Sequence, residues 1–214
     1  MMFQPLSRSC QIHTLNEIYA TYFQANHGTF VEVGANDGEQ WSNTWHLALG
    51  GWRGLYFEPI AELANKCKEK HKANNVSVVQ SCVGDHDGMT KLFLGSGATT
   101  SYHVAKNDTF YYGHSADRFM LSPVVTLNTA LEEYKIAKDF ELLVIDVDGD
   151  ELGVLAGLDL EIWTPFMIII ETCKHHPDLT WRFNALAIDS VLCEKYEEIY
   201  SDHINSIYIC KGYK

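Results

Sequence analysis

Residues 29–38 read Thr-Phe-Val-Glu-Val-Gly-Ala-Asn-Asp-Gly, and this stretch decides the fold. Its first half is a short apolar run that stops at Gly34, as is typical of a strand that is buried on both faces. A glycine at that point permits a tight turn and lets the backbone approach a ligand closely. Gly34 and Gly38 stand at the two ends of the turn. The sequence therefore predicts a ligand-binding turn after the first strand of an α/β sheet.

Outward from this turn, short apolar runs alternate with helical patterns. Further strands are predicted at residues 54–57, 76–83, 142–147, 166–170 and 206–210, and helices at 61–74 and 190–200. Apolar runs separated by helices indicate parallel strands joined by right-handed crossovers. The predicted fold is α/β: a Rossmann-like, doubly wound sheet that is mostly parallel, with an antiparallel edge strand at the C-terminus.

The 214 residues fit one domain, residues 1–214, with the core motifs in residues 28–172. Residues 88–125 break the alternation of strands and helices. A strand is possible at 89–94, and glycines, hydroxyl residues and an aromatic stretch follow it. Long irregular segments in compact domains are usually functional or mobile. We therefore expect a lid or substrate-recognition insertion here.

Composition and charge limit the kinds of partner and cellular location that we expect. The net charge is −12, and the one basic cluster, residues 66–72, is more typical of a solvated helix face than of a nucleic-acid site. No apolar run approaches the roughly 20 residues that span a bilayer. The N-terminus lacks the pattern of a secretory signal, and six scattered cysteines form no CxxC pair. We expect a cytoplasmic protein with no membrane span and no nucleic-acid partner.

Acidic residues follow the predicted parallel strands. Ligands of open α/β sheets bind outside the carboxyl ends of the strands, where these residues should meet. One acid after a strand is most simply a helix N-cap, but five acidic strand ends at one edge of a sheet indicate a shared ligand site. The acids are Glu32, Asp37, Glu58, Asp85, Asp146, Asp148 and Glu171.

The first turn distinguishes two classes of cofactor. Nicotinamide enzymes carry G-x-G-x-x-G at this place, whereas residues 34–38 contain only two glycines. The carboxylates of Glu32 and Asp37 would repel a pyrophosphate, but they would pair with the cationic amino acid end of S-adenosylmethionine. The sequence therefore favours S-adenosylmethionine.

The next two strand ends suit the rest of that cofactor. Glu58 follows Gly34 at about the 20-residue spacing at which an acid accepts both ribose hydroxyls. Gly84 and Asp85 stand where the adenine is expected, and Asp85 could accept a hydrogen bond from its amino group; a simple turn is the alternative. The predicted cofactor-binding residues are Glu32, Gly34, Asn36, Asp37, Gly38, Glu58, Gly84, Asp85 and Asp146.

As an ordered set, these motifs resemble the FkbM-type methyltransferases, within the class I S-adenosylmethionine-dependent fold. The resemblance covers roughly residues 29–172. It rests on residues 30–38, Ser42-Asn-Thr44, Gly51-Trp-Arg-Gly-Leu-Tyr-Phe-Glu-Pro59, residues 143–152 and Ile168-Ile-Ile-Glu171. Most family members carry Glu in place of Asp148 and Ala in place of Asp150. The resemblance implies O-methylation, commonly of sugar or natural-product hydroxyls, without naming the acceptor.

Methyl transfer requires the acceptor oxygen in line with the leaving sulfur and a group that removes its proton. Asp146 and Glu171 are predicted to handle the acceptor hydroxyl, with His175 or His176 as further candidates. Asp146, Asp148 and Glu171 could instead share a divalent cation, magnesium or manganese. In a simpler alternative, Asp146 and Asp148 cap the next helix or bind the cofactor.

Two other functions stay open from the sequence. One is a nicotinamide-dependent oxidoreductase, which the missing third glycine disfavours. The other is a non-catalytic Rossmann-like binding domain, since fold does not fix function. A degraded turn would favour the binding domain, yet Glu32, Gly34, Gly38 and Glu58 are all present. The expected partner is a small-molecule or glycan acceptor.

Overall fold

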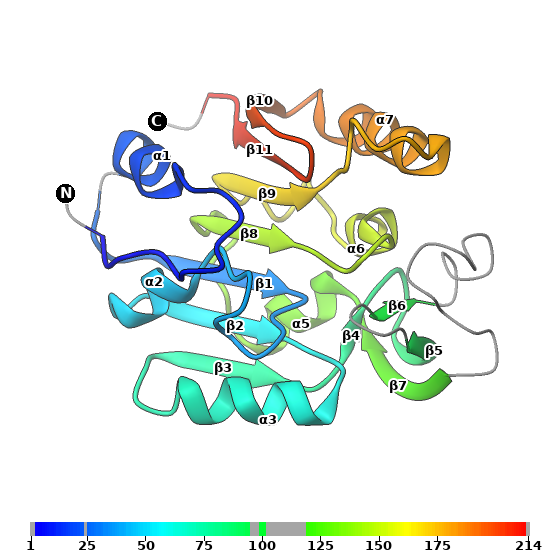
Figure 1. Cartoon of the computed structure of the whole chain (residues 1–214), viewed down its shortest axis with the longest axis horizontal. Helices are drawn as coiled ribbons and strands as arrows, with labels where there is room; N and C mark the ends of the chain where they lie inside the picture. The colour runs from blue at the N-terminus through cyan, green and yellow to red at the C-terminus, as the bar shows by residue number, and fades with distance from the viewer. Residues whose placement is uncertain (1–2, 24, 95–98, 102–118, 213–214) are drawn as a thin grey trace.

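The computed structural model describes residues 3–23, 25–94, 99–101 and 119–212. Its centre is a seven-stranded sheet with strand order β10-β11-β9-β8-β1-β2-β3 (Figure 1). The strands are β1 (Thr29–Val33), β2 (Arg53–Phe57), β3 (Val76–Val79), β8 (Leu142–Ile145), β9 (Met167–Glu171), β10 (Tyr196–Ser201) and β11 (Asn205–Cys210). The predicted Rossmann-like α/β class is confirmed.

The register of the central strands places their carboxyl ends side by side at one edge of the sheet. β3, β2, β1, β8 and β9 run parallel, and Val33 pairs with both Phe57 and Ile145, the last residues of β2 and β8. β11 is antiparallel to both β9 and β10. The antiparallel strand predicted at the C-terminus is thus present, with one more strand outside it.

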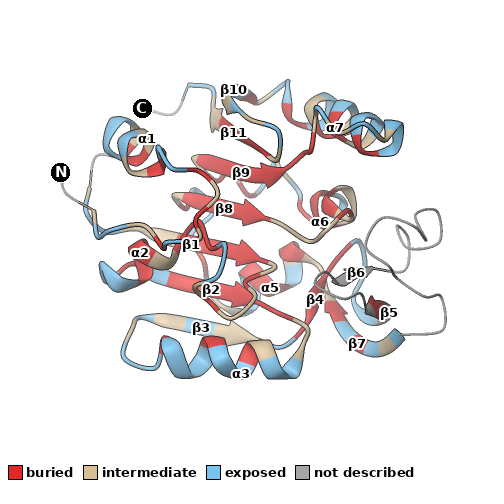
Figure 2. Cartoon of the chain, viewed as in Figure 1, coloured by how far each residue is buried: buried red, intermediate tan, exposed pale blue. Residues whose placement is uncertain are grey.

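Helices cover both faces of this sheet because its central strands are apolar on both faces (Figure 2). Val31 and Val33 pack in a core with α5 (Leu127–Glu133), α6 (Glu151–Ala156) and α7 (Leu179–Leu192). Phe30 packs on the opposite face with α1 (Leu15–Tyr22), α2 (Trp45–Leu49) and α3 (Ala61–Lys70). None of the helices in the described ranges has both the length and the apolar character of a membrane span.

A second sheet lies beyond the carboxyl ends of the central strands (Figure 1). Its order is β4-β7-β5-β6, formed by β4 (Cys82–Val83), β5 (Gly88–Leu94), β6 (Thr99–Ser101) and β7 (Phe119–Val125). The possible strand at 89–94 is therefore confirmed. Residues 95–98 and 102–118, which make up most of the lid or substrate-recognition insertion predicted at 88–125, lie outside the described residues, so this role stays a prediction.

Two boundary predictions are wrong. The strand predicted at 76–83 is two strands in different sheets; between them the Ser81 hydroxyl donates to the carbonyls of Cys82 (2.8 Å) and Pro123 (3.1 Å). The helix predicted at 190–200 ends at Leu192, and β10 follows. Tyr196 is buried at the start of β10, and its hydroxyl donates to the Pro165 carbonyl at 3.0 Å. Tertiary contacts and aromatic residues favour the strand there.

Candidate active site

A pocket opens at the carboxyl ends of β1, β2 and β8 and extends to β4 and β5 of the small sheet. Its lining carries five carboxylates and, among the described residues, no lysine, arginine or histidine. The five are Glu32, Glu58, Asp146, Asp148 and Asp150. Three strand ends of the central sheet thus converge on one strongly acidic cavity, as they do in ligand sites of open α/β sheets.

Gly34 is fixed at the pocket wall by its neighbours. Its φ is +90°, and its N–H donates to the Phe57 carbonyl at 3.0 Å. A Cβ on Gly34 would lie 1.7 Å from the Asp146 carbonyl oxygen. Any side chain would therefore separate β1 from the loop that carries Asp146, which explains the glycine at this position.

Glu58 is held rigidly at the end of β2. One carboxylate oxygen accepts the Ile60 N–H at 2.8 Å, and the other accepts the Asn36 N–H at 3.0 Å. Asn36 adopts a left-handed conformation (φ 51°), which an asparagine tolerates. Burial, and to a smaller degree the charge of Asp148, raise the pKa of Glu58 to about 7. The Asn36–Glu58 hydrogen bond therefore fixes the turn after β1 to the end of β2.

Glu32 is a buried part of the pocket wall, where the Ser42-Asn43-Thr44 turn holds its carboxylate. The hydroxyls of Ser42 (3.1 Å) and Thr44 and the N–H of Asn43 (3.4 Å) donate to it. The Thr44 hydroxyl also bonds to the Tyr56 hydroxyl at 2.9 Å. Burial outweighs these bonds and raises the pKa of Glu32 to about 7. The turn was part of the family resemblance, but this role was not predicted.

Asp37 and Gly38 shape the first turn without lining the pocket. The Asp37 carboxylate accepts the N–H groups of Glu39 (3.0 Å) and Gln40 (2.8 Å) and pairs with Lys70 at 2.8 Å. Gly38 has a φ of +80°, and a Cβ there would lie 2.7 Å from a sulfur atom of α3.

The third strand end differs from its predicted role. Asp85 is half-exposed, hydrogen-bonds to His86 at 2.6 Å and does not line the pocket. Gly84 is also outside the lining, and its carbonyl packs against Gly157. The residues that do line this end are Leu63, Ser81, Cys82, Val83 and Leu92. Sequence reasoning missed most of them because the break between β3 and β4 was not predicted.

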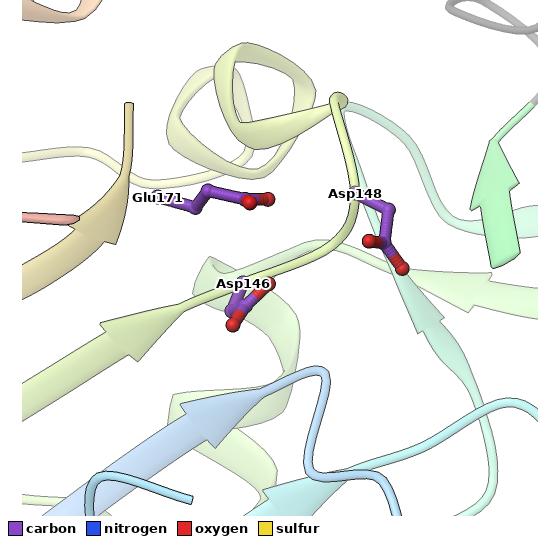
Figure 3. A group of neighbouring side chains, drawn as sticks. All are labelled: Asp146, Asp148 and Glu171. Atoms are coloured by element: carbon purple, nitrogen blue, oxygen red, sulfur yellow. The ribbon is translucent and has the colours of Figure 1, made fainter. Parts of the chain in front are cut away.

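Asp146, Asp148 and Glu171 come together as predicted, with ligand oxygens within 4.8 Å of one another (Figure 3). The two aspartates are partly exposed to the pocket, and Glu171 is buried beside them. Burial, then the charges of Asp148 and Glu151, raise the pKa of Asp146 to about 8. Burial and the charge of Asp146 also raise the pKa of Glu171.

Glu151 is a buried acid that sequence reasoning did not single out. One of its oxygens accepts the N–H groups of Val147 (3.2 Å) and Gly149 (2.9 Å). It thereby holds the loop in which Asp148 adopts a left-handed conformation (φ 57°). The N-cap residue of α6 is Asp150, so neither Asp146 nor Asp148 caps that helix. A glutamate directly after an acidic, glycine-containing loop was the available signal.

The two candidate histidines stand in the turn before α7. His175 is exposed, and Nδ1 of His176 accepts the Asp178 N–H at 3.0 Å. Neither residue lines the pocket. The structure therefore brings together the carboxylates, but not the histidines.

Comparisons with known proteins agree with this geometry. The family model described as the methyltransferase FkbM domain matches residues 32–201. No curated protein matches the chain. Three solved structures share the fold at a TM-score of 0.51. A Staphylococcus aureus protein described as a caffeoyl-CoA O-methyltransferase is 13% identical, with 94% of this chain and 84% of that one aligned.

The second is the METTL16 methyltransferase domain, 12% identical, with 94% of this chain and 66% of that one aligned. The third is WbdD, 13% identical, with 95% of this chain but only 40% of that one aligned. Identities this low indicate the fold alone. The family model, in contrast, matches most of the chain, and the matched range includes every residue that lines the pocket. The chain therefore belongs to the FkbM methyltransferase family.

Proposed function

We propose that this chain is an S-adenosylmethionine-dependent O-methyltransferase that acts on a hydroxyl of a sugar, glycan or natural product. Family membership implies S-adenosylmethionine as the methyl donor. The observation that carries the cofactor assignment is the charge of the pocket: five lining carboxylates and, among the described residues, no basic side chain. Such a cavity favours a cationic ligand and disfavours a pyrophosphate.

The residues present fit this cofactor. Both oxygens of Glu58 are oriented by backbone N–H groups, and each keeps a lone pair for one hydroxyl of a vicinal diol. We therefore assign the ribose to Glu58. Glu32, Gly34 and Asn36 surround the amino acid end, and Asp37 and Gly38 maintain the turn that carries them.

We assign the adenine to the wall formed by Leu63, Cys82, Val83 and Leu92, with Ser81 beside it. This wall is mostly apolar and suits a flat, largely apolar ring. Gly84 and Asp85 then act only through the backbone that positions β4, since Asp85 is directed to solvent and to His86.

We place the acceptor beside the carboxylates that the cofactor does not use. When bound, the cofactor supplies an activated methyl group; its C–S bond breaks as the C–O bond to the acceptor forms, and the hydroxyl proton must leave. Asp146 and Glu171 stand at adjacent strand ends, where they can orient this hydroxyl and receive its proton, directly or as ligands of one cation. His175 and His176 are second candidates for the proton. The acceptor is a small molecule or glycan, because the net charge of −12 disfavours nucleic acid.

Calorimetry with S-adenosylmethionine and with NAD tests the cofactor assignment. We expect one molecule of S-adenosylmethionine per chain and no heat from NAD. Binding of NAD alone would overturn the proposal in favour of an oxidoreductase. The acceptor is then sought by mass spectrometry of candidate glycans incubated with isotope-labelled S-adenosylmethionine. A mass gain of one labelled methyl group identifies it.

A further inference from the structure

We propose that Asp146, Asp148 and Glu171 bind one divalent cation of the magnesium or manganese type, and that this cation positions the acceptor oxygens. The role assigned to the cation rests on the proposed function. The existence of the site does not, since it is argued from the side chains alone.

The geometry suits a single ion. One oxygen from each of the three carboxylates lies within 4.8 Å of the other two. An ion placed between three oxygens that are at most 4.8 Å apart lies within about 2.8 Å of each. This is close to the 2.0–2.6 Å length of a bond from magnesium or calcium to oxygen, so a small movement of the side chains would let one ion bind all three. Figure 3 shows the carboxylate of Glu171 extending from the end of β9 toward the loop that carries Asp146 and Asp148.

A second, independent observation points to a ligand. Glu171 is only 7% exposed, and its Oε2 atom has no hydrogen-bond partner within the described part of the chain. Its other oxygen accepts a weak bond from the Cys173 thiol at 3.6 Å. A buried carboxylate oxygen without a partner costs free energy that folded proteins usually avoid. A cation placed toward the two aspartates would satisfy this atom.

The lysine that follows β9 is engaged by other carboxylates. Lys174 follows β9 but pairs with Asp189 (2.9 Å) and Glu198 (2.7 Å). The alternative occupant is a proton shared between Asp146 and Glu171, whose side chains lie close enough to hydrogen-bond to each other.

The site is open on the side that the acceptor would use. Asp146 and Asp148 line the pocket, while Glu171 closes the cluster from behind. Glu151 fixes the loop between the two aspartates through the N–H groups of Val147 and Gly149. A hexacoordinate ion held by three carboxylates keeps positions for other oxygens, and two of them would select an acceptor with two adjacent oxygen donors, such as a vicinal diol.

The test is titration of the full chain with Mn²⁺ alone, after treatment with EDTA and dialysis. Loss of the electron paramagnetic resonance signal of free Mn²⁺ reports binding without cofactor or acceptor. We expect one strong site per chain. Glu171→Gln and Asp148→Asn should each weaken it by about tenfold or more, because each removes one charged ligand. Glu58→Gln, which removes a carboxyl from the same pocket outside the cluster, should change the affinity less than about threefold.

Three results would overturn the site: no binding of Mn²⁺, unchanged affinity in both cluster variants, or an equal loss in Glu58→Gln. If circular dichroism shows that Glu171→Gln is unfolded, the Mn²⁺ affinity of Asp148→Asn, a substitution at a partly exposed position, is the deciding result. Calorimetry with S-adenosylmethionine in EDTA separates the two proposals. Cofactor binding without Mn²⁺ binding defeats only the cation site, and Mn²⁺ binding without cofactor binding defeats only the proposed function.

Discussion

Gly34 links the fold to the site more tightly than any other glycine of the first turn, because a Cβ there would lie 1.7 Å from the Asp146 carbonyl oxygen. Backbone atoms on a central strand end cannot move aside cheaply. We expect Gly34→Ala to lower the free energy of unfolding by about 3–5 kcal/mol, from steric overlap added to the strain of a positive φ. Urea denaturation followed by circular dichroism measures this loss.

Gly51→Ala is the matched control. Gly51 has a φ of +86°, close to the +90° of Gly34, but nothing lies within 4 Å of its added Cβ. This variant carries the backbone strain without the overlap and should lose only about 1–2 kcal/mol. Equal losses in the two variants would show that the contact with Asp146 does not constrain Gly34.

Asp146 faces the acceptor in the proposed function, whether it receives the proton or binds a cation. We expect Asp146→Asn to lower turnover by about 10²-fold or more, the usual size of such effects, with the fold intact. Single-turnover assays with labelled S-adenosylmethionine measure it. Normal turnover in this variant would mean that the proton leaves by another route, and His175 or His176 would become the better candidate.

The turn at residues 42–44 is the element that holds Glu32. Thr44 is fully buried, and its hydroxyl bonds to both Glu32 and Tyr56. Thr44→Val keeps the shape of the side chain but removes the hydroxyl that bonds to Glu32 and Tyr56. We therefore expect the free energy of unfolding to fall by about 1–3 kcal/mol. Weaker binding of S-adenosylmethionine should accompany it.

Thr44→Ser restores the hydroxyl and should recover most of this loss, although one methyl group is missing from the core. Thermal denaturation of the three proteins, with and without cofactor, compares them. If the serine variant is no better than the valine variant, packing rather than the hydroxyl stabilises the turn.

The same elements show how far the sequence predicts the structure. β1, β2, β8 and β9 were predicted within about two residues, because apolar runs bounded by glycine or acid are strong local signals. The break at Ser81 depends on a contact with Pro123 of β7, 42 residues away, and the strand at Tyr196–Ser201 buries Tyr196, whose hydroxyl bonds to Pro165, 31 residues away. Local patterns cannot report such contacts.

For the site, the sequence predicted which strand ends carry acids but not where each side chain points. Glu58 and Asp146 line the pocket, whereas Asp85 is directed to solvent. The residues that replace Asp85 at that end come from α3, β4 and β5, separate segments that meet only in the folded chain. Glu151 was missed for a related reason, since its function is to hold a loop rather than to face a ligand.

Across the whole molecule, the buried acids make stability depend on pH in an unusual direction. Burial raises the pKa of Glu58 from the ordinary 4.5 to about 7. A carboxyl with a raised pKa contributes stability that is fully present below about pH 4.5 and is lost as pH rises through about 7. We expect the wild type to lose up to about 3 kcal/mol relative to Glu58→Gln between pH 5 and pH 8.

Urea denaturation of both proteins at pH 5, 6, 7 and 8, without cofactor, measures this difference. Comparing the two proteins cancels other titrating groups such as His46, whose pKa burial lowers to about 4. A constant difference over this range would show that Glu58 is already ionised at pH 5 in the folded protein.

The central claim is that Glu58 and the turn after β1 form the binding site for S-adenosylmethionine, and calorimetric titration of Glu58→Ala tests it most directly. Loss of hydrogen bonds to a charged group costs about 1.5–3 kcal/mol. We therefore predict that the dissociation constant rises about 10- to 150-fold, while Glu62→Ala, an exposed neighbour on α3, leaves it unchanged. An unchanged dissociation constant in Glu58→Ala, with circular dichroism showing an intact fold, would contradict the account.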